Sequence, residues 1–469
     1  MIIRNGILVA FFLLLSGCSL FKGRSEPVVL TKTPESWSTR EAKSRPITFW
    51  LDEFRQPRLL ALIEEAFEKN PNLLSQAAAV QLAQVQARLA GADRWPELSA
   101  GLGSSRSKRS GSSGFSLSSV YSTSYDFSLD LSWEVDLWGR LGNGLQAALY
   151  EEEAAQADFE AARLSLAANI IKTVFDGIEA REQLKLSRET VENFKNSLQI
   201  VENGYGYGLY RALDVRLSRS NLLRAVSQLQ SYRIAADQTV RSLEVLLGRY
   251  PGAKLKLPDL LPTLNHSVSA GIPVNLLQRR PDIIAAQGRF KALDQRYIEA
   301  KKSYLPSIRL AGSGGVSSRE LNDFISADQL IWNFTSGLVQ PLFQGGRLDA
   351  FRDEAAILWQ QSEYDYRQTV LFAFQEVETL LSAEKILKEQ EAALTKTAYE
   401  AHEAELLASE DYVSGLTDIN TLLQTQREAF DAESGLLVIR KSRLQNRVNL
   451  YLALGGPIAA NSAKPDQQK

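Results

Sequence analysis

The chain carries the same succession of motifs twice, and this internal repeat restricts the possible folds more than any other feature. The landmarks that recur about 207 residues later are Gly139-Arg140-Leu141 as Gly346-Arg347-Leu348, Tyr205, Gly208 and Leu209 as Tyr412, Gly415 and Leu416, and Leu247-Gly248 as Leu454-Gly455. Each copy predicts a helix, two strands, a long helix and a further helix. The first copy spans 56–250, the second spans 276–456, and a linker rich in proline and leucine occupies 251–275.

Two segments are too long and too poor in helix breakers for a compact domain. Residues 141–203 contain no proline, and residues 348–413 contain neither glycine nor proline. A run of roughly 65 residues makes a helix of about 95 Å. Apolar residues recur every three or four positions, as at Leu164, Ala168 and Ile171, so we expect coiled-coil packing. The predicted helices are 140–204 and 212–248 in the first copy, and 346–414 and 418–455 in the second.

One segment between these helices alternates between apolar and polar residues without interruption. From Ser124 to Leu137, every odd-numbered residue is apolar and every even-numbered residue is polar. This period of two places the two kinds of side chain on opposite faces of a strand. The length suits a tilted membrane strand with one face toward lipid, although a half-buried strand of a sandwich is an alternative. Strands are predicted at about 97–105, 122–137, 306–316 and 330–342, with exposed loops at Ser104–Ser119 and Ser317–Asp328.

Four strands in one chain are too few to close a membrane barrel, for which about eight are the minimum. Open strand edges in lipid would leave backbone groups unpaired, so partner chains are needed. Three copies would supply twelve strands. The predicted fold class is therefore mixed α and transmembrane β, with a homotrimeric 12-stranded β-barrel and twelve long helical segments that form a shared duct.

The N-terminus has the pattern of a secretory signal peptide. Arg4 precedes the apolar run Ile7–Leu15, which is too short to span a bilayer. The run ends in Leu15-Ser16-Gly17-Cys18, which resembles the lipobox of bacterial lipoproteins. We therefore expect a signal peptide at 1–17, acylation of Cys18 and a lipidated N-terminal segment at 18–55, with a tail at 457–469. Ser19 after the cysteine is typical of lipoproteins released to the outer membrane.

Composition and charge argue against several classes of function. The formal net charge of −2 shows no basic excess, so nucleic-acid binding is not expected. Cys18 is the only cysteine, and the two histidines lie far apart in sequence, so no metal site is expected. No Ser/His/Asp or Cys/His set and no phosphate loop appears, and Asp and Glu scattered along long helices usually form a solvated face. We therefore expect neither an enzyme nor a cofactor.

Several motifs resemble those of the TolC-like outer-membrane factors, and most closely the lipidated, OprM-like or NodT-like branch. The motifs are Trp133-Glu134-Val135-Asp136-Leu137-Trp138-Gly139-Arg140, Pro341-Leu342-Phe343-Gln344-Gly345-Gly346-Arg347 and Arg279-Arg280-Pro281-Asp282-Ile283. The resemblance extends from Cys18 to about Gly456. It implies an outer-membrane barrel that continues into a periplasmic helical tunnel. It also implies a passive exit duct for drugs or other small toxic compounds in a tripartite efflux system.

The resemblance further implies that the turns after the long helices form the inner end of the tunnel. The helix-hairpin tips expected to dock other components are Tyr205, Gly208 and Leu209, and Tyr412, Gly415 and Leu416. A narrow gate is expected just after the second turn, with Asn420, Thr421 and Gln424 lining it and Asp418 at its mouth. Family members often have aspartates at the positions of Thr421 and Gln424. A cation-binding ring is therefore either absent here or moved to Asp418.

The implied partners are two further copies of the chain, a periplasmic adaptor, an inner-membrane pump of the RND type and outer-membrane lipid. The exit duct of a type I protein-secretion system has the same fold and stays an alternative. A lipid-anchored coiled-coil scaffold or adhesin is an alternative from a functional class other than transport. Such a scaffold would have no amphipathic strands and would conduct no ions.

Overall fold

The computed structural model describes residues 36–38, 51–54, 57–113, 116–264, 273–320 and 330–456. The signal peptide at 1–17, acylation of Cys18 with its neighbour Ser19, most of segment 18–55 and the tail at 457–469 lie outside these residues. The chain forms two compact units. Unit 1 contains Ala79–Gln156 and Ala285–Arg367, and unit 2 contains Thr31–Ala78, Ala157–Ile284 and Gln368–Lys469.

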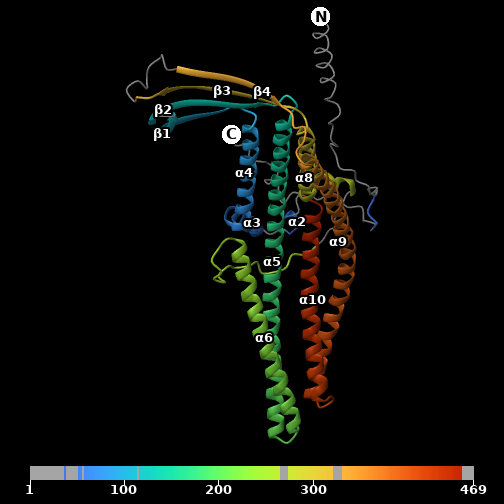
Figure 1. Ribbon diagram of the computed structural model, residues 1–469. Coiled ribbons are helices and arrows are strands. Elements are labelled where there is room, and N and C mark those ends of the chain that lie inside the picture. The colour runs from blue at the N-terminus through green and yellow to red at the C-terminus, as the bar shows by residue number, and fades with distance from the viewer. Residues whose placement is uncertain are drawn as a thin grey trace. The chain divides into compact units, whose positions relative to one another are not determined.

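The main helices come in pairs of equal length (Figure 1). They are α4 (Pro71–Ala92) and α8 (Pro281–Lys302) with 22 residues each, α5 (Arg140–Gly206) and α9 (Arg347–Val413) with 67, and α6 (Ala212–Leu246) and α10 (Ile419–Ala453) with 35. Pro71 and Pro281 each occupy the first helical position, where the missing N–H of proline has no helical partner to lose.

Shorter helical pieces precede these pairs. They are α2 (Leu51–Phe54), α3 (Pro57–Lys69), the 3₁₀ turn η2 (Pro273–Asn275) and α7 (Leu276–Arg279). Among the helices that the structure describes, none combines the length and apolar character needed to cross a membrane.

Unit 1 contains an antiparallel sheet in the order β1-β2-β3-β4. Its strands are β1 (Glu97–Ser113), β2 (Ser116–Val135), β3 (Ser307–Ser318) and β4 (Leu330–Val339). The prediction of a loop over Ser104–Ser119 is wrong, because both strands run through most of it. Although serine and glycine are poor strand formers, the backbone of β1 pairs with the strongly alternating β2 as far as Ser113↔Ser116. Likewise, Ser317 and Ser318 belong to β3 rather than to the loop predicted there.

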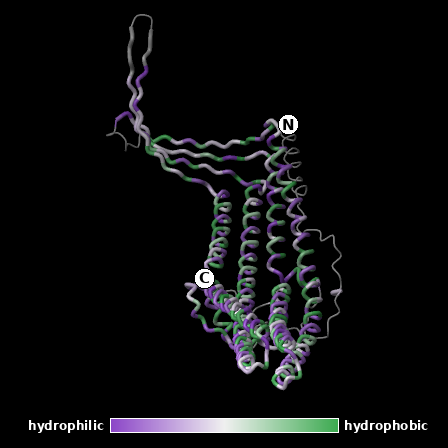
Figure 2. The backbone as a smooth tube through the Cα atoms, turned by 90° about the horizontal axis from the view of Figure 1, so that it is seen from below, coloured by the Kyte–Doolittle hydropathy of each residue, from purple (hydrophilic) through white to green (hydrophobic). Residues whose placement is uncertain are grey.

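The register of the sheet places most apolar residues on one face. Directly paired residues share a face, and side chains alternate along each strand. The pairs Leu98↔Leu131 and Gly312↔Phe334 fix this face. Its larger apolar members are Leu98, Leu102, Phe127, Leu129, Leu131, Trp133, Val135, Ile308, Leu310, Val316, Leu330, Trp332, Phe334 and Leu338. The opposite face carries mainly serine, glycine and charged residues, and Figure 2 shows the resulting alternation of colour along the strands.

The junction between β2 and α5 is held by side chains of the motif at residues 133–140. The Asp136 carboxylate accepts hydrogen bonds from the backbone N–H of Leu141 at 3.1 Å and of Gly142 at 2.7 Å, so it caps the start of α5. Arg140 pairs with Glu134 across the turn at 2.7 Å. These contacts fix the direction in which the long helix leaves the sheet.

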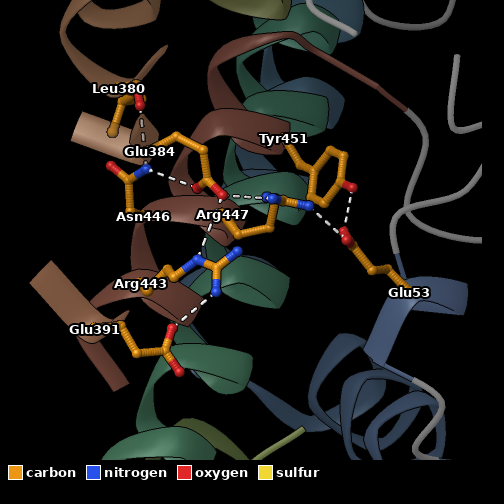
Figure 3. A network of polar contacts seen from close by, with 8 residues as sticks. All are labelled: Glu53, Leu380, Glu384, Glu391, Arg443, Asn446, Arg447 and Tyr451. Carbon is orange, nitrogen blue, oxygen red and sulfur yellow. Dashed lines mark hydrogen bonds and ion pairs between the residues drawn. The ribbon is translucent and has the colours of Figure 1, made fainter. Parts of the chain in front are cut away.

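Unit 2 has an apolar core to which several helices contribute, and a charged network lies beside it. The core is centred on Phe54 (α2), Ile63 (α3), Phe175 and Ile178 (α5), Leu243 (α6) and Val448 (α10). Beside it, Arg447 of α10 is 1% exposed and pairs with Glu53 and Glu384, each at 2.5 Å (Figure 3). The side chain of Glu53 is also buried, at 3% exposed.

The network extends to further side chains around Arg447 (Figure 3). The hydroxyl of Tyr451 donates to Glu53, and the amide of Asn446 donates to Glu384 at 3.2 Å. Arg443 pairs with Glu391 at 2.8 Å. Buried charges are stable only when they are paired and hydrogen-bonded, so this network fastens α10 to both α9 and the segment that contains Glu53.

Candidate functional site

Each long helix is followed by a glycine in the left-handed conformation, within the repeated Tyr-x-x-Gly-Leu sequence. Gly208 has φ of 76° and Gly415 has φ of 73°. The backbone N–H of Leu209 donates to the carbonyl of Gly204 at 2.9 Å, and that of Leu416 donates to Asp411 at 2.8 Å. The N–H of Gly208 also donates to the carbonyl of Tyr205 at 3.0 Å, and that of Gly415 to Tyr412 at 3.1 Å, which completes a Schellman motif in each turn. It reverses the chain within a few residues, so α6 and α10 run back along α5 and α9 (Figure 1).

We define the first tip as residues 204–214 and the second tip as residues 411–421. Their matched tyrosines have different environments. Tyr205 is 51% exposed, whereas Tyr412 is buried and stacks on Tyr210 with ring centroids 5.2 Å apart. A Cβ on Gly204 would lie 2.1 Å from the ring of Tyr210, so only glycine leaves room for that ring. Burial of Tyr412, together with Tyr210, raises the pKa of its hydroxyl.

The four predicted gate residues lie at the end of the second tip and in the first turns of α10. Asp418 is the N-cap, and its carboxylate accepts the N–H of Thr421 at 3.0 Å. That hydrogen bond, helped by nearby Arg211, lowers the pKa of Asp418. Asn420, Thr421 and Gln424 are exposed on one side of the helix. Their neighbours Ile419, Leu422 and Leu423 are buried on the other side.

The first tip has the reverse arrangement at the matching positions. Arg211 is the N-cap of α6, and its backbone N–H donates to the carboxylate of Asp214 at 3.0 Å. Asp214 therefore stands where Thr421 stands in the second tip, and Arg211 stands where Asp418 stands. No sequence pattern had indicated Arg211, Asp214, Tyr210 or Gly204. The offset of 207 residues applied to Asp418 and Thr421 would have identified the first two.

Apolar side chains join the two hairpins just behind the tips. The buried members of this cluster are Phe194 and Val201 of α5, Ala225 of α6, Ala408 and Tyr412 of α9, and Ile419, Leu422 and Leu423 of α10. Within this region the buried amide of Gln426 donates to the hydroxyl of Ser197 at 3.0 Å. The tips themselves expose apolar groups, with Tyr207, Leu209 and Leu416 each at least 75% exposed.

The exposed side chains of the two tips differ in chemistry. They include the aromatic and aliphatic residues Tyr207, Leu209 and Leu416, and also the charged residues Arg211, Asp411 and Asp418. Within the described part of the chain, no group of His, Cys, Asp and Glu residues could hold a metal ion. Arg211 of the first tip and Asp418 of the second tip carry opposite charges and attract each other electrostatically.

Comparisons with known proteins agree with this architecture. The family model of outer membrane efflux proteins matches residues 62–249 and 272–456. A pyoverdine export outer membrane protein, OpmQ of Pseudomonas putida, is 30% identical over 98% of this chain and 98% of its own length. The toluene efflux pump outer membrane protein TtgF of the same species is 28% identical over 97% of this chain and 98% of its own length.

A solved structure is similar over almost the whole chain. The open state of the MtrE outer membrane channel of Neisseria gonorrhoeae is 27% identical, with a TM-score of 0.81, and the match covers 93% of this chain and 98% of that one. Proteins of this family are transport ducts with a helical tunnel in the periplasm. The chain thus belongs to the outer membrane efflux protein family and is an efflux channel of the outer membrane.

Proposed function

We propose that three copies of this chain form the exit duct of a tripartite pump that expels drugs or other small toxic compounds. The observation that carries this proposal is the sheet, which has one apolar face across all four strands and unpaired edges at β1 and β4. In lipid, each unpaired backbone group costs several kcal/mol. Three sheets joined edge to edge make a closed barrel of twelve strands and remove these edges.

The length of the apolar face also supports a membrane barrel. Tyr125 and Val135 mark the ends of this face on β2, ten residues apart. That is about 34 Å along the strand, or roughly 26 Å along the membrane normal for a strand tilted by about 40°. The apolar band of outer-membrane barrels is about 25 Å tall.

Native mass spectrometry in detergent tests the assembly. We expect a mass of three chains, and a stable monomer that keeps its strand signal in circular dichroism would contradict the proposal.

A pair of substitutions on β2 tests which face meets lipid. Leu129→Arg should impair membrane insertion, because arginine near the bilayer midplane costs about 2–4 kcal/mol, whereas Ser128→Arg on the other face should not. Equal insertion of both variants would disprove the assignment of the faces.

The partners of the duct follow from the exposed tips. We assign Tyr205, Gly208 and Leu209 of the first tip, and Gly415 and Leu416 of the second, to the docking surface for a periplasmic adaptor and an RND-type inner-membrane pump. Tyr412 acts there through its stack with Tyr210. Exposed aromatic and aliphatic groups at a chain reversal suit a protein partner. Leu209→Asp with Leu416→Asp should abolish export in cells while the trimer still forms, whereas Thr425→Asp should change export little.

The gate is assigned to Asn420, Thr421 and Gln424, with Asp418 at its mouth. Their exposure on one side of α10 leaves them available to face a channel or a neighbouring subunit. Because Cys18 would be acylated, Asn420→Cys or Gln424→Cys introduces the only free thiol. Short bismaleimides should join subunits through either thiol, and bilayer conductance should then stay low. Ser227→Cys, on an exposed position of α6, is the control and should not cross-link. Cross-linking of the control alone would place the constriction elsewhere.

The lipid anchor is a separate part of the proposal. The lipobox-like sequence supports acylation of Cys18, with Ser19 directing release to the outer membrane. The barrel is a second anchor, so Cys18→Ala should impair processing more than membrane retention. Mass spectrometry of the N-terminal peptide of the mature protein decides this, and an unmodified Cys18 would refute the anchor alone.

A further inference from the structure

The hairpin of β1 and β2 is longer than the four-stranded part of the sheet. The outermost pair between β2 and β3 is Tyr125↔Ser318, whereas pairing between β1 and β2 continues to Ser113↔Ser116 (Figure 2). Nine residues of each strand, 105–113 of β1 and 116–124 of β2, therefore extend beyond β3. At about 3.3 Å per residue, this two-stranded extension measures roughly 30 Å.

The apolar face of β1 leads directly to two cations on this extension. Side chains alternate along the strand, so Arg106 and Lys108 share the face of Leu98 and Leu102. Tyr121 is paired directly with Lys108 and lies on the same face. Along this face the order is thus aliphatic residues, then Ser104 opposite Tyr125, and then the two cations beside Tyr121. Arg109, the third cation of the hairpin, lies on the opposite face.

The two cations are held by an aromatic ring. The guanidinium carbon of Arg106 lies 5.8 Å from the ring centroid of Tyr121, and the ammonium of Lys108 lies 5.3 Å from it. The ring itself is 57% exposed. Within the described ranges neither cation forms an ion pair, and the sequence from Leu98 to Tyr125 contains no acidic residue. Two positive charges without a carboxylate partner favour an anionic ligand.

We infer that Arg106, Lys108 and Tyr121 bind phosphate groups of anionic lipid in the outer leaflet of the outer membrane. This inference rests on the proposed barrel, in which the apolar face meets lipid. Arg106 is four residues beyond Leu102, which is roughly 13 Å along the strand and about 10 Å along the membrane normal. The headgroup layer begins at the edge of the apolar band, so both cations lie at its level. An aromatic residue at this boundary is also typical of membrane barrels.

The test compares lipid retention by three forms of the full-length protein. The forms are the wild type, the double variant Arg106→Gln with Lys108→Gln, and the matched control Arg109→Gln, which removes a charge from the other face. Native mass spectrometry of the detergent-purified trimer is recorded with diphosphorylated lipid A, with the same lipid after removal of its phosphates, and with inorganic phosphate as competitor.

We expect the double variant to bind diphosphorylated lipid A roughly 20- to 30-fold more weakly, since each basic side chain near an anionic lipid surface contributes about five-fold. The Arg109→Gln control should stay within about two-fold of the wild type. The dephosphorylated lipid should not distinguish the three forms, and inorganic phosphate at equal concentration should not displace lipid A.

Equal binding of lipid A by all three forms, or an equal loss in the Arg109→Gln control, would overturn the inference. Displacement by inorganic phosphate at equal concentration would overturn it too, because the site would then recognise free phosphate. The mass of the same samples and their conductance in bilayers separate this outcome from failure of the proposed function. Conducting trimers with unchanged lipid binding would refute the lipid site alone.

Discussion

The helices α6 and α10 have the same length and matching positions in the two copies, but they are fixed by different interactions. At the position of the buried Arg447 in α10, α6 has Val240, which packs partly buried against the apolar core. At the position of Tyr451, α6 has Glu244. Its carboxylate accepts hydrogen bonds from the backbone N–H groups of residues 253–255, at 2.7 to 3.1 Å.

The two helices therefore have the same length and position in their copies although different interactions hold them in place. In the first copy, Glu244 links α6 to residues 253–255, which follow the helix directly. The second copy fastens its helix through ions to a segment almost 400 residues earlier, because Glu53 and Arg447 are 394 positions apart. The second arrangement concentrates more interaction energy in one side chain, and the copies should therefore respond differently to substitution.

Arg447→Ala should have the largest effect on stability. It leaves Glu53 and Glu384 without their main partner, and breaking a buried ion pair typically costs about 3–5 kcal/mol. We expect a clearly lower melting temperature of the detergent-purified protein in circular dichroism. The control Arg440→Ala removes an exposed arginine of the same helix, whose contact with Glu391 is 3.6 Å, and should cost less than about 1 kcal/mol. Similar melting temperatures for both variants would remove the contrast between the copies.

Glu244→Ala should cause the next largest loss of stability. It tests the contact between α6 and residues 253–255 in the first copy. Three backbone N–H groups would lose their acceptor, at a cost of about 1–3 kcal/mol. Burial opposes the charge of Glu244, but these N–H groups lower its pKa overall. The stabilisation is therefore present above the unfolded pKa near 4.5 and lost as the pH falls through the lower folded value. Asp237→Ala, in an exposed pair with Arg241, is the control, and an equal loss there would contradict the assignment.

Gly204→Ala should have a smaller effect, confined to the first tip. The new Cβ would overlap the ring of Tyr210 and disturb its stack on Tyr412, and overpacking of this kind costs about 1–3 kcal/mol. Hydrogen exchange at residues 204–214 should become faster. Gly206→Ala is the matched control, because nothing lies within 4 Å of its added Cβ. If both variants exchange alike, the stack does not stabilise the tip.

Asp418→Ala should have the smallest effect, a faster hydrogen exchange over the first turn of α10. Asp418→Asn keeps an acceptor for the N–H of Thr421 and should exchange like the wild type. The pKa of Asp418 is lowered in the folded state, so the cap is intact above the usual value of 3.8 and weakens as the pH falls through the lower folded pKa. Arg211→Ala in the first tip should change little, because the Arg211 side chain is 72% exposed and the hydrogen bond from its backbone N–H to Asp214 remains.

The extent to which the sequence predicted this molecule depended on how local each signal is. The alternation from Ser124 to Leu137 identifies a strand by itself, and long runs without proline identify α5 and α9. The Ser/Gly-rich part of β1 has no such signal, because its strand state comes from pairing with β2. Arg447 looked like one more charge on a long helix, since its partners are distant in sequence. The gate residues came from the family resemblance, not from any pattern of their own.

The stack of Tyr210 on Tyr412 has a consequence for oxidation chemistry. The two rings come from different hairpins and lie nearly parallel, with an interplanar angle of 16°. One-electron oxidation of both phenols gives two radicals that can couple through their ring carbons to form dityrosine, a fluorescent cross-link. The unmodified protein therefore contains its own reporter of hairpin separation. A short exposure to a one-electron oxidant should yield dityrosine only while the two hairpins remain together at their ends.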